Sequence, residues 1–268
     1  MLPTALQVYS VRTDAERDLA GTFKAIKSYG YDGVELAGLY GKSAKEFARV
    51  TAASGLVPVS AHVPLADLRA DTGKIISDYK EIGCKNIVVP YLPQEDRPGT
   101  PGWKNTVKDV RAICEKLTDK GFTVSYHNHD FEFALDGNGD YYLDALYSAI
   151  PAELLKAEID VCWARVGGVD PAEYLEKYAE RIPLVHLKDY AGGKSDRMYA
   201  LIGVDDGKEA QSEFEFRPLG RGVQDMKKII ASAEKSGAEW LIVEQDEPSM
   251  GLSRLECAKI SADYLKTI

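Results

Sequence analysis

Cysteine is scarce in this sequence, and its spacing argues against a disulfide framework. The 268 residues include four cysteines and no C-x-x-C pair. Well-separated cysteines are typical of small buried residues in a reducing compartment. The amino end, MLPTALQVYSVR, enters a strand pattern at once and lacks the layout of a signal peptide. A cytoplasmic protein is therefore expected, although a signal removed upstream would leave the same sequence.

Positive charge and long apolar runs are also lacking. The formal net charge is −9 at pH 7, which disfavours nucleic acid and anionic membranes as main partners because both would repel the protein. No apolar run is long enough to cross a bilayer. A small molecule is the expected partner, and a homo-oligomer is compatible with this composition.

The length and composition fit one α/β domain. The chain is close to the roughly 250 residues typical of a (β/α)8 barrel. Its 45% hydrophobic and 28% charged residues are ordinary for a soluble globular protein. We therefore expect residues 1–268 to form one domain whose core needs no disulfide or structural metal.

Short runs rich in Val and Ile alternate with stretches of helical period along the whole chain. Such alternation demands a parallel sheet with helical crossovers, and eight units favour closure into a barrel. No Gly-x-Gly-x-x-Gly follows the first strand, so the main signal of an open dinucleotide-binding sheet is missing. The prediction is a single (β/α)8 TIM barrel. Its strands are expected at residues 6–9, 33–36, 57–62, 86–92, 122–129, 156–163, 183–189 and 240–246.

One segment departs from the regular alternation. Residues 190–222, after the seventh strand, are far longer than the usual connection between a strand and its helix. An insertion here lies at the carboxyl-end face of a barrel, where active sites are built. Two interpretations stay open, a lid over the active site or a hairpin without a role in function.

Polar side chains gather at the carboxyl ends of the predicted strands, and all four histidines of the chain fall there. These strand ends surround one mouth of a barrel. A buried charge is costly unless it is paired or bound to metal, so the gathering indicates a site. Residues two apart share a strand face. The inward-facing pairs are expected to be His127 with His129, Glu158 with Asp160, His186 with Lys188, and Glu244 with Asp246.

Imidazoles and carboxylates without thiolates suit a divalent metal ion. Mn, Mg, Co, Zn and Fe all accept such donors, and the pattern does not choose among them. A single residue of this kind is often only a buried hydrogen-bonded group. Because the residues lie together on neighbouring strands, the pattern favours one metal ion.

The motifs at these strand ends resemble the sugar phosphate isomerase/epimerase superfamily, the xylose-isomerase-like barrels. That superfamily includes ketose 3-epimerases, inosose isomerases and dehydratases, and AP endonucleases. This chain has too few histidines for the three-metal cluster of the endonucleases and is not basic. Its fifth-strand motif looks like that of a subgroup of sugar isomerases and keto-sugar-processing enzymes. In chain order the motifs are LQVYSVR, DGVEL, SAH, YHNHDFEF, EIDVCWA, VHLKD, GRG and VEQDE.

The resemblance implies a set of metal ligands. Members of the superfamily bind metal through a Glu on strand five, an Asp on strand six, a His on strand seven and a Glu on strand eight. Asp160, His186 and Glu244 match the last three. On strand five His127 takes the place of the glutamate and would be a neutral ligand. Because that glutamate is also one of two opposed bases in the epimerases, a two-glutamate mechanism is in doubt here.

Proton transfer next to a carbonyl needs an electrophile and a base within hydrogen-bond reach. The bound ion would be the electrophile. By the same resemblance Glu244 would be base as well as ligand, with His129 or Lys188 as the opposite acid or base. His129 is preferred because imidazole titrates near neutral pH. Lys188 could instead simply pair with Asp189 or Glu158.

Six further residues near strand ends are expected to contact the substrate. Arg221 would anchor a hydroxyl, carboxylate or phosphate group, and Trp163 would stack on a sugar face. The alternatives are a structural hydrogen bond for His62, a solvated position for Arg221 and core packing for Trp163. The six are Gln7, Glu35, His62, Glu132, Trp163 and Arg221.

These features predict a metal-dependent isomerase or epimerase that transfers a proton next to the carbonyl of a sugar or sugar derivative. A lyase or dehydratase on a keto-sugar or inosose is an alternative, since it shares the enolate chemistry but expels a β-substituent. A non-catalytic sugar-binding barrel is a second alternative, which the altered fifth strand makes conceivable. The retained Asp160, His186 and Glu244 argue against it.

Overall fold

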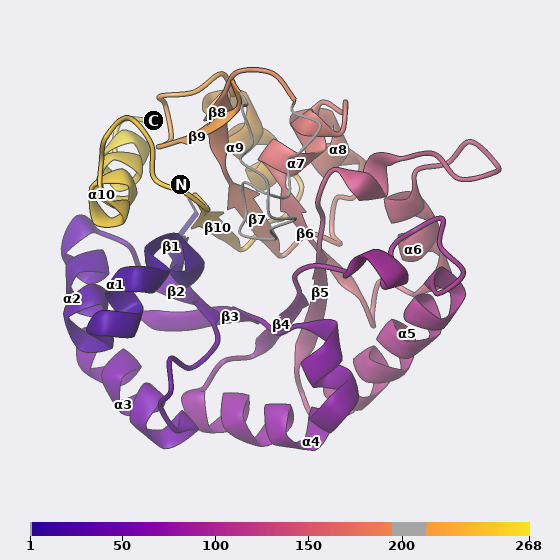
Figure 1. Cartoon of the computed structure of the whole chain (residues 1–268), viewed down its shortest axis with the longest axis horizontal. Helices are drawn as coiled ribbons and strands as arrows, with labels where there is room; N and C mark the ends of the chain where they lie inside the picture. The colour runs from indigo at the N-terminus through magenta and orange to yellow at the C-terminus, as the bar shows by residue number, and fades with distance from the viewer. Residues whose placement is uncertain (1, 195–212) are drawn as a thin grey trace.

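Eight parallel strands form a closed barrel in the computed structural model, which describes residues 2–194 and 213–268. Around the barrel the order is β1, β10, β7, β6, β5, β4, β3 and β2, with the helices arranged outside (Figure 1). The predicted (β/α)8 fold is confirmed. The strands are β1 (Thr4–Gln7), β2 (Gly33–Ala37), β3 (Val57–His62), β4 (Asn86–Val89), β5 (Thr123–His127), β6 (Lys156–Asp160), β7 (Leu184–Leu187) and β10 (Trp240–Val243).

Helices follow every barrel strand, as the alternation predicted. The stretch after β1 is divided into α1 and α2, and the stretch after β6 into α7 and α8. Short 3-10 turns lie at Val8–Val11, Gln94–Asp96 and Phe131–Phe133. The helices are α1 (Arg12–Arg17), α2 (Leu19–Tyr29), α3 (Ala44–Ser54), α4 (Leu65–Ile82), α5 (Trp103–Asp119), α6 (Tyr142–Ala149), α7 (Val161–Val166), α8 (Pro171–Lys177), α9 (Met226–Lys235) and α10 (Arg254–Leu265).

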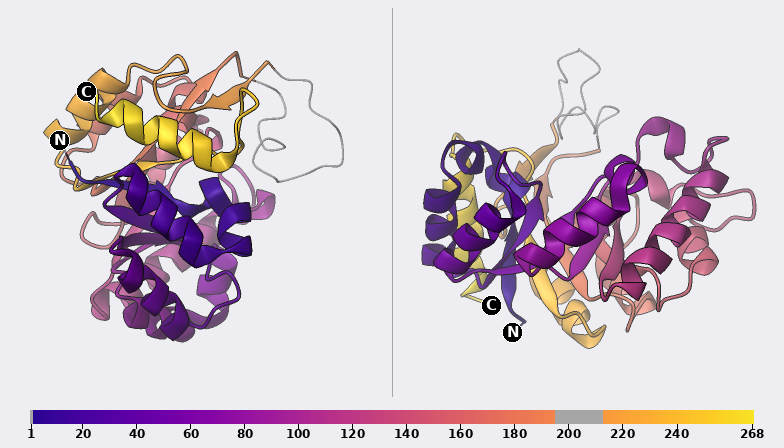
Figure 2. Two further views of the ribbon diagram at one scale, coloured as in Figure 1. Left: turned by 90° about the vertical axis from the view of Figure 1, so that its left-hand side faces the viewer. Right: turned by 90° about the horizontal axis from the view of Figure 1, so that it is seen from below.

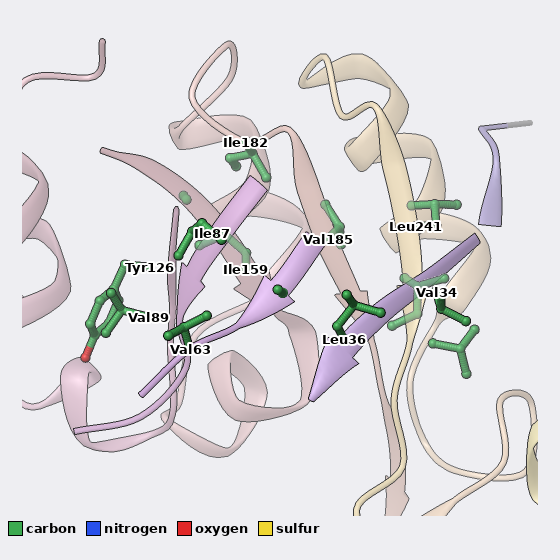
Figure 3. Close-up of a cluster of buried hydrophobic side chains, with 14 of the residues drawn as sticks. Val34, Leu36, Val63, Ile87, Val89, Tyr126, Ile159, Ile182, Val185 and Leu241 are labelled. Atoms are coloured by element: carbon green, nitrogen blue, oxygen red, sulfur yellow. The ribbon is translucent and has the colours of Figure 1, made fainter. Parts of the chain in front are cut away.

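The main core lies between the barrel and its helices. Outward-facing strand side chains such as Val34, Ile159 and Val185 are fully buried there (Figure 3), and each buried aliphatic side chain stabilises the fold by about 1.5–3 kcal/mol. A smaller apolar group, which includes Ala5, Leu184 and Ile242, lies inside the barrel. Two residues further along the same strands the inward positions become polar, at Gln7, His186 and Glu244.

The strands end earlier than predicted. β5, β6 and β10 end at His127, Asp160 and Val243, whereas the predicted strands ran on to residues 129, 163 and 246. At β6 the reason is local, because Asp160 Oδ1 accepts hydrogen bonds from the backbone N–H groups of Cys162 and Trp163 and so begins α7. Several of the polar residues assigned to strand ends therefore lie in the loops at the barrel mouth.

The long segment after β7 begins and ends as an antiparallel hairpin. β8 (Asp189–Ala191) pairs with β9 (Glu215–Arg217), on the side of the barrel opposite the amino terminus (Figure 2). Its aromatic side chains Tyr190 and Phe216 pack in one cluster with Trp163. A hairpin is thus present in these residues. The lid interpretation concerns residues 195–212, which lie outside the described residues.

The two ends of the chain lie close together (Figure 2). β1 pairs with β10, with Thr4 opposite Leu241, and this pairing closes the barrel. Outside it α10 packs beside α2. Within residues 2–194 and 213–268, no helix combines the length and the apolar character needed to cross a membrane.

Candidate functional site

A cavity of about 770 Å³ lies at the carboxyl ends of the barrel strands. Pockets for small ligands commonly measure roughly 300–1,000 Å³. Polar side chains from the strand ends line one part of it, and one face of α4 lines another. Five of the predicted site residues contribute to this lining, namely His62, His127, His129, Lys188 and Glu244.

Four buried side chains beside the cavity bring possible metal-binding atoms together. His127, Asp160, His186 and Glu244 each offer one atom, and these atoms lie within 4.8 Å of one another. His127 Nε2 is 3.9 Å from Asp160 Oδ2, and His186 Nδ1 is 3.1 Å from Glu244 Oε2. Two imidazoles and two carboxylates are donors that divalent transition metals accept. We call these four residues the ligand quartet; its composition is consistent with a metal site.

Backbone hydrogen bonds around Asp160 occupy one oxygen of its carboxylate and leave the other facing the quartet. Oδ1 is taken by the two N–H groups that begin α7. Oδ2 is buried and accepts no hydrogen bond from the described residues. The backbone N–H of Asp160 donates to Asn128 Oδ1 at 3.0 Å, which fixes the end of the strand. Lys188 Nζ lies 3.3 Å from Oδ2, and as a buried carboxylate oxygen without a hydrogen bond Oδ2 would also be stabilised by a metal ion.

Lys188 carries a positive charge into the same cluster. Its Nζ lies 2.7 Å from Asp246 Oδ2, 2.8 Å from Glu244 Oε2 and 3.3 Å from Asp160 Oδ2. Burial alone would lower the pKa of Lys188, but the three carboxylates outweigh burial and hold that pKa well above its usual value. The ammonium group therefore stays charged and partly balances the carboxylates beside the cavity.

Among the described residues, the Asp189 side chain does not contact the cluster that Lys188 joins. Its carboxylate is directed to the loop after β9, so the alternative pairing of Lys188 with Asp189 or Glu158 is wrong. Lys188 faces the barrel axis, as the two-residue period predicted, and meets the carboxylates of β6 and β10 instead. The Asp189 carboxylate accepts hydrogen bonds from the backbone N–H groups of Tyr190, Gly220, Gly222 and Gln224.

Two glutamates from β2 and β6 contact the histidines of the quartet. Glu158 Oε2 is 3.1 Å from His127 Nδ1, and Glu35 Oε2 is 2.6 Å from His186 Nε2. His62 Nε2 lies between them, 2.7 Å from Glu158 Oε2 and 3.1 Å from Glu35 Oε2. Burial would lower the pKa of His62, but the two carboxylates raise it to about 10. The structural hydrogen bond considered for His62 is thus present, although His62 also lines the cavity.

His129 lies at the cavity wall among aromatic rings. Its ring centroid is 5.1 Å from that of Tyr91, 5.7 Å from that of Phe131 and 5.3 Å from that of Trp163. Burial and then the charge of Lys188 lower the pKa of His129 well below its usual value. The imidazole is therefore neutral near pH 7 and able to accept a proton.

Glu132 supports the loop that carries His129. Its Oε2 accepts the backbone N–H of His129 at 2.8 Å, and its Oε1 accepts the hydroxyl of Tyr126 at 2.6 Å. Burial raises the pKa of Glu132 to about 8. Glu132 is not among the residues that line the cavity. Its carboxyl group is enclosed by protein, so the expected contact with substrate is not supported.

The structure also leaves Gln7, Glu35, Trp163 and Arg221 outside the cavity lining. Gln7 Nε2 donates to Glu35 Oε2 at 2.7 Å, so these two side chains bind each other. Trp163 is fully buried, with its ring centroid 6.0 Å from that of Phe216. Arg221 is exposed. Core packing and solvent exposure, the alternatives for Trp163 and Arg221, describe these residues better than substrate contact.

One face of α4 lines the cavity, and sequence reasoning missed it. Polar residues three and four apart on a helix ordinarily indicate a solvated face, so the sequence of α4 carried no signal of a cavity. Asp246 and Tyr91 also line the cavity; the strand-end pattern included Asp246 but gave it no role. The lining residues of α4 lie on both sides of Asp71, where the backbone leaves helical geometry, and are Asp67, Ala70, Asp71, Lys74, Ile75, Asp78 and Tyr79.

Comparison with known families classifies the barrel. A family model described as the xylose isomerase-like TIM barrel matches residues 23–268. The chain belongs to this family. The matched residues include all of the ligand quartet and most of the cavity lining. The resemblance inferred from the strand-end motifs is confirmed at the level of the family.

Two similar curated proteins are named inosose dehydratases. That of Clostridium beijerinckii is 26% identical over 170 residues, which cover 61% of this chain and 54% of the relative. That of Geobacillus kaustophilus is 25% identical over 201 residues, which cover 69% of this chain and 63% of the relative. The chain thus spans little more than half the length of these relatives.

A solved structure shares the whole fold. The sugar phosphate isomerase/epimerase from Parabacteroides distasonis superposes with a TM-score of 0.78 and 22% sequence identity. The superposition covers 99% of this chain and 93% of that one. At this identity the likeness supports the family's barrel fold and not a particular activity.

Proposed function

We propose that this xylose isomerase-like barrel is a metal-dependent lyase that removes water from an inosose or a related keto-sugar. The observation that carries the proposal is the ligand quartet, whose four atoms lie within 4.8 Å of one another beside a large cavity. The similarity to inosose dehydratases favours water loss over the isomerisation expected from the sequence. The dehydratase alternative therefore becomes the preferred reaction class.

The quartet would hold one divalent ion, such as Mn, Mg, Co, Zn or Fe. The buried Asp160 Oδ2, which accepts no hydrogen bond from the described residues, supports this fit. So does the donor set, because imidazole and carboxylate together suit divalent transition metals. When bound, the ion would polarise the substrate carbonyl and stabilise negative charge on its oxygen.

The base that removes the proton beside the carbonyl must line the cavity. We assign this role to His129, because Glu244 is already engaged by His186 and Lys188. His129 takes the proton, and the C–H electron pair forms the carbon–carbon double bond of an enolate. The enolate then expels the hydroxyl group of the next carbon, which accepts the proton now carried by His129 and leaves as water. Lys188 lines the same cavity and is placed to donate a hydrogen bond to that departing oxygen.

Substrate hydroxyl groups would meet the remaining polar lining of the cavity. His62, Tyr91 and Asp246 are the candidates close to the quartet in the fold. The five predicted contacts that lie outside the cavity lining are not part of this proposal.

An isomerase or epimerase is the second candidate. Such an enzyme returns a proton to a neighbouring carbon or to the opposite face, and it needs a second acid or base for that step. His129 and Glu244 both line the cavity and would supply the pair. The chemistry up to the enolate is the same in the two candidates.

Incubation with inososes and keto-sugars in deuterated water tests the proposal. We expect a product that has lost one water, together with solvent deuterium at the carbon that lost the hydroxyl group, where the enol takes up a proton as it becomes a ketone. His129→Gln should abolish turnover while metal content is retained, because the amide cannot accept the proton. His186→Ala should lose the metal itself.

The outcomes separate the candidates. Deuterium in recovered substrate or in an isomer without water loss would support the second candidate instead. Full metal content in both Asp160→Ala and His186→Ala, measured by elemental analysis, would contradict the metal site on which both candidates depend.

A further inference from the structure

Beneath the ligand quartet lies a second group of buried ionisable side chains. His62, Glu158, His127 and His186 also bring four possible metal-binding atoms within 4.8 Å of one another. Glu35 joins them, with Oε2 3.1 Å from His62 Nε2. Glu35 and Glu158 are fully buried. Two carboxylates in such a place need a specific role, because burying a charge is costly unless it is paired.

Each of these glutamates contacts a quartet histidine through the ring nitrogen that faces away from the quartet. In His127, Nδ1 is 3.1 Å from Glu158 Oε2, while Nε2 faces Asp160 Oδ2. In His186, Nε2 is 2.6 Å from Glu35 Oε2, while Nδ1 faces Glu244 Oε2. In a neutral imidazole, a carboxylate that accepts the N–H of one ring nitrogen leaves the other nitrogen with a lone pair for a metal ion.

The two glutamates are also joined to each other and to the barrel wall. His62 Nε2 lies within 3.1 Å of Oε2 in both of them. Ser60 Oγ donates to Glu35 Oε1 at 2.6 Å, and Gln7 Nε2 donates to Glu35 Oε2 at 2.7 Å. These contacts come from β1, β2 and β3, which are neighbours in the barrel wall. Glu35 and His62 thus come from β2 and β3, which supply no quartet ligand, whereas Glu158 lies two residues before Asp160 on β6.

We propose that Glu35, His62 and Glu158 form a positioning layer that holds His127 and His186 in the tautomers and orientations needed to bind the quartet's metal ion. Glu158 accepts the Nδ1–H of His127, Glu35 accepts the Nε2–H of His186, and His62 Nε2 lies between the two carboxylates. The inference rests on the metal site proposed above. The group of His62, His127, Glu158 and His186 is accordingly not a second metal site.

A second ion in the lower group would compete with the first. His127 and His186 belong to both groups. Two ions would require each of these rings to bind metal through both of its nitrogens and to lose both of its protons. With one ion, each ring keeps one N–H and donates it to a carboxylate, which is the usual arrangement around a metal-bound histidine. The shared histidines therefore favour one ion with a supporting layer.

Manganese binding to the full chain and its variants tests the layer. Free Mn²⁺ is measured by electron paramagnetic resonance during titration of metal-free protein. Glu158→Gln keeps an acceptor but loses the charge, and Glu158→Met loses both. We expect one ion per chain throughout, with affinity about 10-fold weaker in the first and approaching 100-fold weaker in the second. Glu35→Gln should behave like Glu158→Gln, because it acts on the other histidine.

Glu132→Gln is the matched control. It removes a carboxyl group that is equally buried but hydrogen-bonded to Tyr126 and the backbone of His129, and we expect it to leave the Mn²⁺ affinity unchanged. The visible spectrum of bound Co²⁺ gives a second readout, which should shift in Glu158→Gln and not in the control. Circular dichroism confirms that each variant is folded. If the variant at one glutamate does not fold, the Mn²⁺ affinity of the variant at the other glutamate tests the layer.

Each result has one meaning. Wild-type affinity in both Glu35→Gln and Glu158→Gln, with binding lost in Asp160→Ala, would overturn the layer and leave the proposed function standing. Two Mn²⁺ ions per wild-type chain, falling to one in Glu158→Gln, would also overturn it. No Mn²⁺ binding by the wild-type protein would contradict the metal site itself.

Discussion

Asp160 divides its two carboxylate oxygens between folding and the candidate site. Oδ1 accepts the N–H groups of Cys162 and Trp163, and Oδ2 is left facing His127 Nε2. A substitution at this position therefore has two effects, loss of a helix cap and loss of a quartet donor. Asp160→Asn can keep the cap through its amide oxygen, so it is a cleaner probe of the metal site than Asp160→Ala.

At the scale of single residues, the sequence was informative where alternation decides the direction of a side chain. The inward pairs on β5, β6, β7 and β10 were predicted from spacing alone, and the four members of the quartet do come together. The predictions of substrate contact failed for residues whose surroundings depend on distant segments of the chain. Trp163 is covered by a hairpin that follows it by about fifty residues in the chain, and Glu132 folds back on Tyr126. No local pattern reports such contacts.

Glu132 provides a prediction about stability and pH. Its folded-state pKa of about 8 lies above the ordinary 4.5, so the folded protein keeps a proton that the unfolded chain has lost. The stabilisation from this group is therefore complete below about pH 4.5 and is lost as the pH rises towards 8. Glu132→Gln removes this titration. Relative to the wild type, the variant should gain stability from pH 5 to pH 8, on the order of a few kcal/mol, at about 1.4 kcal/mol per pKa unit.

Urea unfolding of both proteins at several pH values measures this difference. The lost hydrogen bond to Tyr126 or His129 shifts the variant by the same amount at every pH and does not change the trend. Glu153→Gln, at an exposed position, serves as control and should run parallel to the wild type. A Glu132→Gln curve that also runs parallel to the wild type would contradict the raised pKa.

At the scale of elements, the alternation of strands and helices was predictable, but their ends were not. A strand pattern continues into apolar residues such as Val161 and Cys162, yet β6 stops because Asp160 caps the next helix. The cavity face of α4 was equally hidden, since a polar helix face looks the same in sequence whether water or a cavity covers it. Both failures arise because partners in space, and not neighbours in sequence, decide the outcome.

The loop after β9 offers a prediction at this scale. A Cβ atom at Gly222 would lie 2.1 Å from Asp189 Oδ1 and 2.3 Å from the carbonyl oxygen of Tyr190. Gly222→Ala should therefore push away the carboxylate that binds the loop and destabilise the protein by about 1–3 kcal/mol. Guanidinium unfolding gives the loss in free energy.

Gly193 is the matched control for that substitution. It lies on the β8 side of the same hairpin, and a Cβ atom there would meet no atom within 4 Å. Gly193→Ala should leave the unfolding midpoint almost unchanged. Equal stability of the two variants would show that the Asp189 contacts do not hold the loop.

For the whole molecule, the closed barrel was predictable because eight repeated units leave few topologies open. The same closure gathers side chains from β5, β6, β7 and β10 at one mouth. A metal ion bound there would link several strands and favour the folded state. At a concentration 100 times its Kd, such an ion adds about 2.7 kcal/mol to the free energy of unfolding.

Thermal unfolding with and without Mn²⁺ measures this effect. For a domain of this size the Tm should rise by about 5–10 °C, at roughly 2–4 °C per kcal/mol. Asp160→Asn should lose most of the rise, because the remaining donors bind the ion weakly. A rise of the same size in Asp160→Asn would place the stabilising ion elsewhere on the protein.

The cavity face of α4 has a consequence for turnover. It continues past the interruption of the helix at Asp71, so a long ligand would touch Ile75 or Tyr79 with parts that take no part in bond breaking. Binding energy from such remote contacts can help to hold the reacting carbon in place. A truncated substrate then has a lower kcat as well as a lower affinity. The helix face would thereby select substrates by length. The substrate with the highest kcat would be the one whose far end contacts this face.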